Sequence, residues 1–183
     1  MSVTVLFVPG LRDHVEDHWQ SHAARALPGS VTVEPLTTQR LSRAARVAAL
    51  DAALQAIPGE VVIAAHSAGC LMVAAWALAP TRKVKGALLA TPADVECPLP
   101  PGYPTFDELD ANGWLPIARS PLPFPAIVAA SRNDPLAGYD KVAQLAASWG
   151  ALLHDAGNVG HLNPPAGFGA WPQGLDLIAQ LAE

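Results

Sequence analysis

Short runs of apolar and β-branched residues recur along the chain with little polar alternation, and this pattern constrains the fold most strongly. Such runs are typical of strands buried on both faces, and here they alternate with segments of helical periodicity. Parallel strands need long right-handed crossovers, so we predict a doubly wound α/β fold, with helices on both faces of an about six-stranded parallel sheet. The predicted strands are residues 3–8, 31–34, 61–65, 86–90, 126–130 and 151–154.

The segments between these strands show the spacing of amphipathic helices. Apolar residues recur at intervals of three or four, which places them on one helix face. In the first segment the polar residues, Arg46 among them, fall elsewhere around the helix. The apolar stripes are Val47, Leu50, Leu54 and Ile57, then Tyr139, Val142, Leu145 and Trp149, and finally Leu175, Ile178 and Leu181.

One region departs from this alternation. Nine of the 18 prolines fall within residues 92–125. Proline cannot donate to a strand ladder and truncates helices, so no long regular element is expected there. We predict a minimal proline-rich cap beside the site, within a single domain of residues 1–183.

Composition and charge argue against several classes of function. The formal net charge is −5, and no run of Lys or Arg could neutralise a phosphate backbone, so nucleic acid is not an expected partner. No apolar stretch is long enough to span a bilayer, and no basic leader precedes the first strand, so we expect a cytoplasmic protein without membrane contact. Cys70 and Cys97 lack metal-ligand spacing, and a disulfide is not required.

The third predicted strand runs directly into His66-Ser67-Ala68-Gly69 and then into a helix-compatible segment. This order is typical of a nucleophile elbow, in which a strained turn exposes a serine. The residues two before and two after the serine must be small, and Ala65, where Gly is usual, and Gly69 both qualify. The alternative is that Ser67 caps an ordinary helix.

The acid and the base of a triad are expected on loops after later strands, in the chain order Ser, acid, His. Asp134 follows the fifth strand, although it could also be a turn residue before Pro135. His161 follows the last strand among glycines that permit irregular backbone. We therefore predict Ser67 as nucleophile, Asp134 as acid and His161 as base.

Other titratable residues fit these roles less well. Asp140 and Asp155 do not lie just after the fifth strand, and His66 and His154 are interpreted as structural. His14, His18 and His22 are spaced by four, but no glutamate base accompanies them, so we predict no metal site. His18-Trp19 is instead expected to begin a helix.

The oxyanion of the reaction requires backbone donors that are already in place. We predict the amides of Ala68, after the nucleophile, and of Leu11, after the first strand. Gly10 lets the chain turn there, although Pro-Gly is also an ordinary turn. Gly10 and Trp114 are the candidate substrate-binding residues, with the cap aromatics either lining an acyl pocket or forming plain core.

Several specific segments spread over nearly the whole chain support these assignments: Phe7-Val8-Pro9-Gly10, Asp17-His18-Trp19-Gln20, Ala65-His66-Ser67-Ala68-Gly69, Ser131-Arg132-Asn133-Asp134-Pro135, Gly160-His161-Leu162-Asn163, Gly167-Phe168-Gly169 and Trp171-Pro172. With them the chain resembles the small serine hydrolases of the retinoblastoma-binding protein 9 family, a branch of the α/β-hydrolases. The resemblance implies the same triad and esterase-type activity on small acyl substrates without a cofactor. The Leu-x-Cys-x-Glu peptide of the animal member is missing, so retinoblastoma-protein binding is not expected.

We therefore predict a serine hydrolase that cleaves small acyl esters through an acyl-enzyme. His161 would remove the Ser67 proton, and Asp134 would hold the imidazole in the correct tautomer. Amide cleavage, as in an aminopeptidase, uses the same triad and remains open. A non-catalytic α/β module that binds a protein partner is the alternative from another class.

Overall fold

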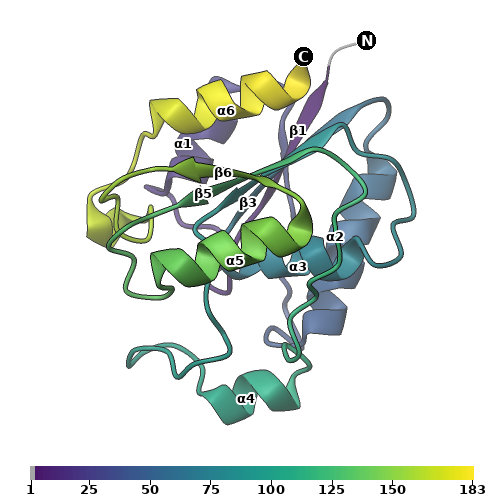
Figure 1. Ribbon diagram of the computed structural model, residues 1–183. Helices are drawn as coiled ribbons and strands as arrows, with labels where there is room; N and C mark the ends of the chain where they lie inside the picture. The colour runs from purple at the N-terminus through teal and green to yellow at the C-terminus, as the bar shows by residue number, and fades with distance from the viewer. Residues whose placement is uncertain (1–2) are drawn as a thin grey trace.

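The computed structural model describes residues 3–183, which form a parallel sheet with helices on both faces (Figure 1). The strand order is β2-β1-β3-β4-β5-β6, and every neighbouring pair is parallel. This order reverses direction beside β1, as in a doubly wound sheet, so the predicted fold class is confirmed. The strands are β1 (Thr4–Val8), β2 (Val31–Thr32), β3 (Val61–His66), β4 (Gly86–Ala90), β5 (Ala126–Ala130) and β6 (Leu152–Asp155).

The prediction that all six strands are buried holds for the centre of the sheet and is wrong at its edges. β3, β4 and β5 are buried along their whole length. In β6, by contrast, Leu152 and Leu153 are 66% and 43% exposed. An edge strand has one neighbouring strand, so less of it is covered.

Several helices begin or end at residues that can cap them. The Ser42 side chain accepts a hydrogen bond from the Ala45 amide at the start of α2, and Gly150 ends α5 in the left-handed conformation with φ of 65°. α1 starts directly after His18, as predicted. The helices are α1 (Trp19–Ala26), α2 (Arg43–Ala56), α3 (Ala68–Trp76), α4 (Phe106–Ala111), α5 (Tyr139–Trp149) and α6 (Pro172–Ala182).

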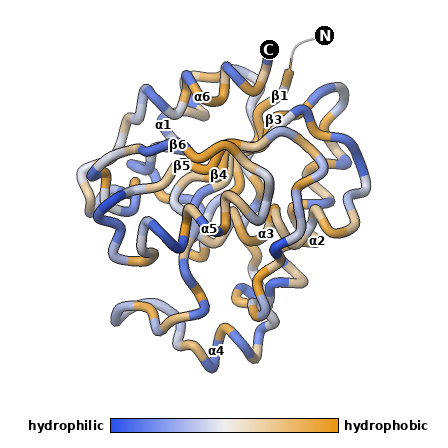
Figure 2. The backbone as a smooth tube through the Cα atoms, viewed as in Figure 1, coloured by the Kyte–Doolittle hydropathy of each residue, from blue (hydrophilic) through white to orange (hydrophobic). Residues whose placement is uncertain are grey.

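Two hydrophobic cores lie on opposite faces of the sheet, because successive strand residues point to opposite sides. In β1, Leu6 and Val8 contribute to the core under α2, α3 and α5, whereas Val5 and Phe7 contribute to the core under α1 and α6. Figure 1 shows the two helix layers, and Figure 2 shows the hydrophobic strands between them. Because all neighbouring strands are parallel, their carboxyl ends meet at one edge of the sheet, where the site is expected.

The proline-rich segment contains no long regular element, as predicted. Residues 92–125 contain the short helix α4, which begins with a capping box between Thr105 and Glu108. Leu109 and Ile117 from this segment are buried in the core beneath α2 and α3. The segment therefore extends that core.

Trp114 belongs to the same core, which corrects its assignment to the substrate site. Its side chain is 1% exposed, and its indole N–H donates to the Leu41 carbonyl at 2.7 Å. A buried tryptophan needs a partner for its N–H, and Leu41, in the turn before α2, provides one. Trp114 therefore joins the cap segment to the turn before α2 and does not line the cavity that contains Ser67.

Replacing Trp114 with alanine should therefore destabilise the protein. Trp114→Ala is expected to lower the free energy of unfolding by about 3 to 5 kcal/mol, since it removes a fully buried aromatic side chain. Phe106→Ala is the matched control, because Phe106 lies in the same segment but is 39% exposed. Urea denaturation of both variants measures the difference, and equal losses would contradict the core assignment.

Candidate active site

Ser67 occupies a sharp turn between β3 and α3, with φ of 57° and ψ of −126°. L-residues rarely adopt this conformation, so the surrounding structure must hold it. The Ser67 amide donates to the Ala90 carbonyl at 3.0 Å. At Gly69, an added Cβ would lie 2.4 Å from the Val8 carbonyl oxygen and 2.9 Å from that of Pro9. Only glycine lets α3 approach the end of β1 this closely.

The structure brings together the three residues that the sequence predicted as a triad. His161 Nε2 lies 2.9 Å from Ser67 Oγ, and His161 Nδ1 lies 2.8 Å from Asp134 Oδ2. The side chains of His161 and Asp134 are 4% and 1% exposed, so water does not compete for this bond. Because the carboxylate accepts from Nδ1, the neutral imidazole presents its Nε2 lone pair to the serine hydroxyl.

Asn133 joins the loops that carry Asp134 and His161. Its Oδ1 accepts hydrogen bonds from the Gly160 amide at 2.7 Å and from Ser131 Oγ at 3.0 Å. Asp134 Oδ1 also accepts from the Leu136 amide at 2.8 Å, which fixes the carboxylate. The sequence analysis missed Asn133, because nothing in the sequence pairs it with residue 160.

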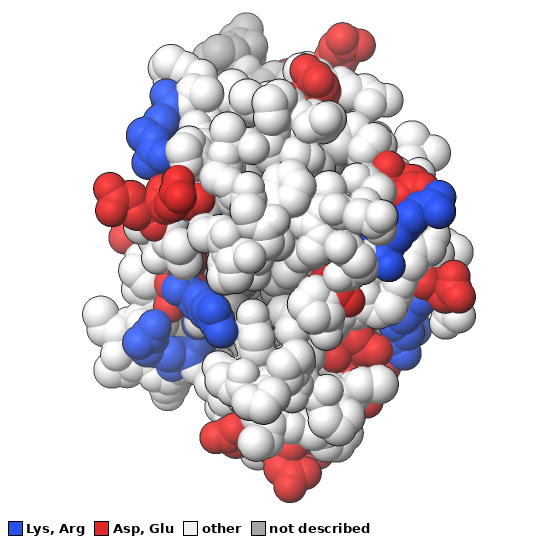
Figure 3. Space-filling view, turned by 90° about the vertical axis from the view of Figure 1, so that its left-hand side faces the viewer, with Lys and Arg blue, Asp and Glu red and all other residues white. Residues whose placement is uncertain are grey.

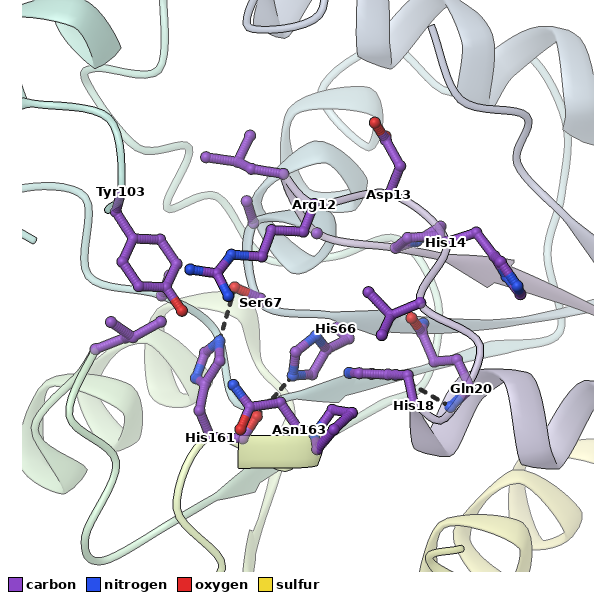
Figure 4. A pocket seen from close by; sticks show the side chains of 18 of the residues that line it. Arg12, Asp13, His14, His18, Gln20, His66, Ser67, Tyr103, His161 and Asn163 are labelled. Carbon is purple, nitrogen blue, oxygen red and sulfur yellow. Dashed lines mark hydrogen bonds between the residues drawn. The ribbon is translucent and has the colours of Figure 1, made fainter. Parts of the chain in front are cut away.

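His66 contacts His161, so it lies closer to the site than a purely structural role implied. Its Nε2–H donates to the His161 carbonyl at 2.8 Å, and the two rings lie 4.8 Å apart. The His18 ring lies 4.4 Å from that of His66 on the other side. Three imidazoles thus lie in a row, tilted against one another, from His161 toward the start of α1 (Figure 4).

Burial keeps the imidazoles of His66 and His18 neutral. Desolvation is the largest effect on both, and the neighbouring His161 acts in the same direction. The pKa of His18 is lowered to about 4, and that of His66 lies well below its usual value. At neutral pH both rings are therefore uncharged.

The other histidines make separate contacts. His14 Nδ1 lies 3.3 Å from Ser21 Oγ, His22 Nε2 lies 2.7 Å from Asp17 Oδ1, and His154 lies in β6. His18 Nδ1 accepts from the Gln20 amide and thereby caps α1. In residues 3–183 no three His, Cys, Asp or Glu side chains are grouped to hold a metal ion.

Arg46 contacts the loop after β1, although its position on α2 suggested only that it avoids the apolar stripe. Its side chain is 5% exposed and pairs with Asp13 at 2.9 Å. The same guanidinium donates to the carbonyls of Leu11 at 3.3 Å and Gly10 at 3.5 Å. Asp13, with φ of 56°, also pairs with the exposed Arg40 at 3.0 Å. Arg46 therefore anchors the loop after β1.

This anchored loop holds the predicted oxyanion donors next to the serine. An added Cβ on Gly10 would lie 3.1 Å from Ser67 Cβ, which shows how closely the loop approaches. In the described chain neither the Leu11 amide nor the Ala68 amide donates a backbone hydrogen bond. Both residues line the cavity that contains Ser67, so their amides are available to a ligand.

The cavity has a volume of about 240 Å³ and lies at the carboxyl ends of the strands. Gly10 lines it, as predicted. The cap contributes Val95, Leu99 and Tyr103, while Pro164 and Pro165 border the other side. Figure 3 views the molecule from this edge, and the charged side chains lie mostly toward the margins of the face. The cavity is thus bordered mainly by uncharged surface.

Solved structures show the same architecture. A YdeN-like hydrolase from Pectobacterium atrosepticum is 30% identical, with a TM-score of 0.81, and the match covers 100% of this chain and 94% of that one. The ydeN gene product of B. subtilis shares the fold at 15% identity, with a TM-score of 0.74 over 99% of this chain and 98% of that one. A thioesterase of prodiginine biosynthesis from Streptomyces coelicolor also shares it, at 15% identity and a TM-score of 0.64 over 99% of this chain and 89% of that one.

The sequence itself places the chain in a family. No curated protein matches it. The family model described as serine hydrolase matches residues 5–180, a span that contains the elbow and both loops that meet at Ser67. The chain therefore belongs to the serine hydrolase family.

Proposed function

We propose that the protein hydrolyses small acyl esters through a covalent acyl-enzyme on Ser67. The observation that carries this proposal is the continuous hydrogen-bonded path from Ser67 Oγ through the His161 ring to the Asp134 carboxylate. His161 Nε2 takes the hydroxyl proton as Oγ attacks the ester carbonyl, and then returns it to the departing alcohol. Water, activated by the same nitrogen, cleaves the acyl-enzyme. These steps need no cofactor.

The negative charge that develops on the carbonyl oxygen needs donors already in place. The amides of Ala68 and Leu11 are suited to this role, since both residues line the cavity and neither amide is used within the described fold. Ala68 also opens α3, where the helix dipole favours an anion. Arg46 would act as a positioning residue, because its bonds to the Leu11 and Gly10 carbonyls set the direction of the loop.

The neutral rings of His66 and His18 support the role of His161 as base. During attack His161 becomes an imidazolium ion, and a charged neighbour would oppose that change. His66 and His18 remain uncharged because they are buried. The positive charge then faces the Asp134 carboxylate alone.

The dimensions of the cavity favour a small substrate. A volume of about 240 Å³ bordered by Val95, Leu99 and Leu136 suits a short acyl group. Within the serine hydrolases we place the chain near the retinoblastoma-binding protein 9 branch on the segments around Ser67, Asp134 and His161. The proposed partner is the acyl substrate, without binding to the retinoblastoma protein.

Removing the nucleophile tests the proposal directly. Ser67→Ala is expected to lower the turnover of p-nitrophenyl acetate by roughly 10⁴-fold or more, as losses of triad residues do in serine proteases. A fluorophosphonate probe should label wild type on Ser67 and leave the variant unlabelled, which mass spectrometry detects. Ser148→Ala is the control, because Ser148 Oγ is exposed and bonds only to Gln144 within α5.

Three results would count against the proposal. Undiminished hydrolysis by the folded Ser67→Ala variant would exclude this nucleophile. Folded wild type that takes no label and cleaves no ester would favour a binding module. Faster cleavage of aminoacyl p-nitroanilides than of esters would favour an amidase.

The two arginines that pair with Asp13 provide a matched test of the loop. Arg46→Gln should lower kcat by about tenfold with little change in KM, because a misplaced Leu11 amide weakens binding of the transition state more than that of the substrate. Arg40→Gln also removes one positive charge that pairs with Asp13, but it removes no bond to the Leu11 or Gly10 carbonyls. The decrease in kcat should therefore be much smaller. Steady-state kinetics measures both, with Arg46→Lys expected to recover part of kcat. Equal losses in Arg46→Gln and Arg40→Gln would contradict the positioning role.

The lowered pKa of His18 makes the fold sensitive to acid. Folding lowers this pKa from 6.5 to about 4, so the unfolded chain binds the proton more tightly. The free energy of unfolding that neutral His18 contributes is fully present above the unfolded pKa of 6.5. It decreases as the pH falls toward the folded pKa of about 4, and the loss is about 2 kcal/mol at pH 5. His18→Asn keeps a side chain that can cap α1 but removes the titrating group. Urea denaturation at pH 7 and pH 5 should show a smaller loss in this variant, and an identical loss would contradict the assignment.

A further inference from the structure

The charged residues around the cavity are not equally neutralised. Asp13 and Arg12 both line it, but Asp13 is paired with Arg46 and Arg40. Arg12 forms no ion pair with any carboxylate in residues 3–183. A full positive charge therefore borders the same cavity as Ser67 without a counter-ion.

The neighbours of Arg12 in sequence fix where its side chain can reach. On one side the Leu11 carbonyl accepts from Arg46, and on the other the Asp13 carboxylate pairs with the same guanidinium. The backbone on both sides of Arg12 is thus held from α2. Its side chain extends from this loop toward the cap, where Cζ lies 4.5 Å from the centre of the Tyr103 ring (Figure 4).

This contact positions the guanidinium and leaves its hydrogen-bonding groups available. The Tyr103 ring contacts the guanidinium near Cζ, whereas the N–H donors point outward from the edge of the planar group. That edge matches the two oxygens of a carboxylate. No hydrogen bond occupies the Arg12 side chain in the described structure.

We propose that Arg12, held by Tyr103, is a carboxylate subsite, and that the preferred substrates are acyl esters that carry a carboxylate besides the scissile bond. This inference rests on the proposed hydrolase function and defines its substrate class. The protein as a whole has a net charge of −5, so its overall field does not attract an anion. A preference for anionic substrates would therefore have to come from a local group such as Arg12.

Matched pairs of esters test the subsite. The first pair is the p-nitrophenyl monoester of glutaric acid and its methyl-capped analogue, which places the carboxylate on the acyl side. The second pair is 4-acetoxybenzoate and its methyl ester, which places it on the leaving group. We expect wild type to prefer the anionic member of one pair by about tenfold in kcat/KM, and the pair that shows this preference locates the subsite.

Variants at Arg12 connect that preference to the residue. Arg12→Gln should reduce the preference to near unity, and Arg12→Lys should retain part of it, because lysine keeps the charge but loses the planar fork. Arg25→Gln is the matched control, since it removes the same charge from an exposed residue of α1 that does not line the cavity. A preference lost equally in Arg12→Gln and Arg25→Gln would overturn the proposal.

A binding measurement separates this proposal from the hydrolase assignment. In the Ser67→Ala background, calorimetry with monomethyl glutarate should show binding that weakens about tenfold when Arg12→Gln is added. Hydrolysis of neutral esters without any anionic preference would overturn the subsite and leave the hydrolase intact. Absence of both ester hydrolysis and probe labelling would overturn the hydrolase, and absence of Arg12-dependent binding would then overturn the subsite as well.

Discussion

The close approach of α3 to the end of β1 is the constraint on which the site depends. At Gly69 the backbone of α3 passes so near the Val8 and Pro9 carbonyls that no side chain fits. This approach holds Ser67 in a backbone conformation that an isolated peptide would avoid. It also places the loop after β1 beside the serine. One steric condition thus positions Ser67, the proposed nucleophile, and the loop that carries a proposed oxyanion donor.

Hydrogen bonds from polar groups around the site hold the loops that carry Asp134 and His161. Asn133 joins the loops of Asp134 and His161, and His66 holds the His161 backbone. Together with the bond from His161 Nδ1 to Asp134, these contacts fix His161 from three directions, so little reorganisation would be needed when a proton moves. Preorganisation of this kind is a main source of catalytic power in water-excluded sites.

Two arginines at the loop after β1 have different proposed roles, one in positioning the loop and one in binding the substrate. Arg46 is buried and bonds to backbone, so it acts on the loop, whereas Arg12 is exposed and reaches the cavity. Two residues of the same type therefore have different roles because their surroundings differ. The guanidinium of Arg46 is desolvated, so its N–H groups must bond to the acceptors around it. The exposed guanidinium of Arg12 keeps its N–H donors available.

The sequence by itself determined the strands and helices, the elbow at Ser67 and the order of Asp134 and His161, because local propensity and the position of loops after strands depend on neighbouring residues. Only the tertiary structure decided which distant residues meet. It paired Asp13 with Arg46, placed Asn133 beside Gly160, moved Trp114 into the core and exposed Leu152 at the sheet edge. Each of these placements depends on how separate segments pack together. The residue pattern within one segment does not indicate which residues of another segment it will contact.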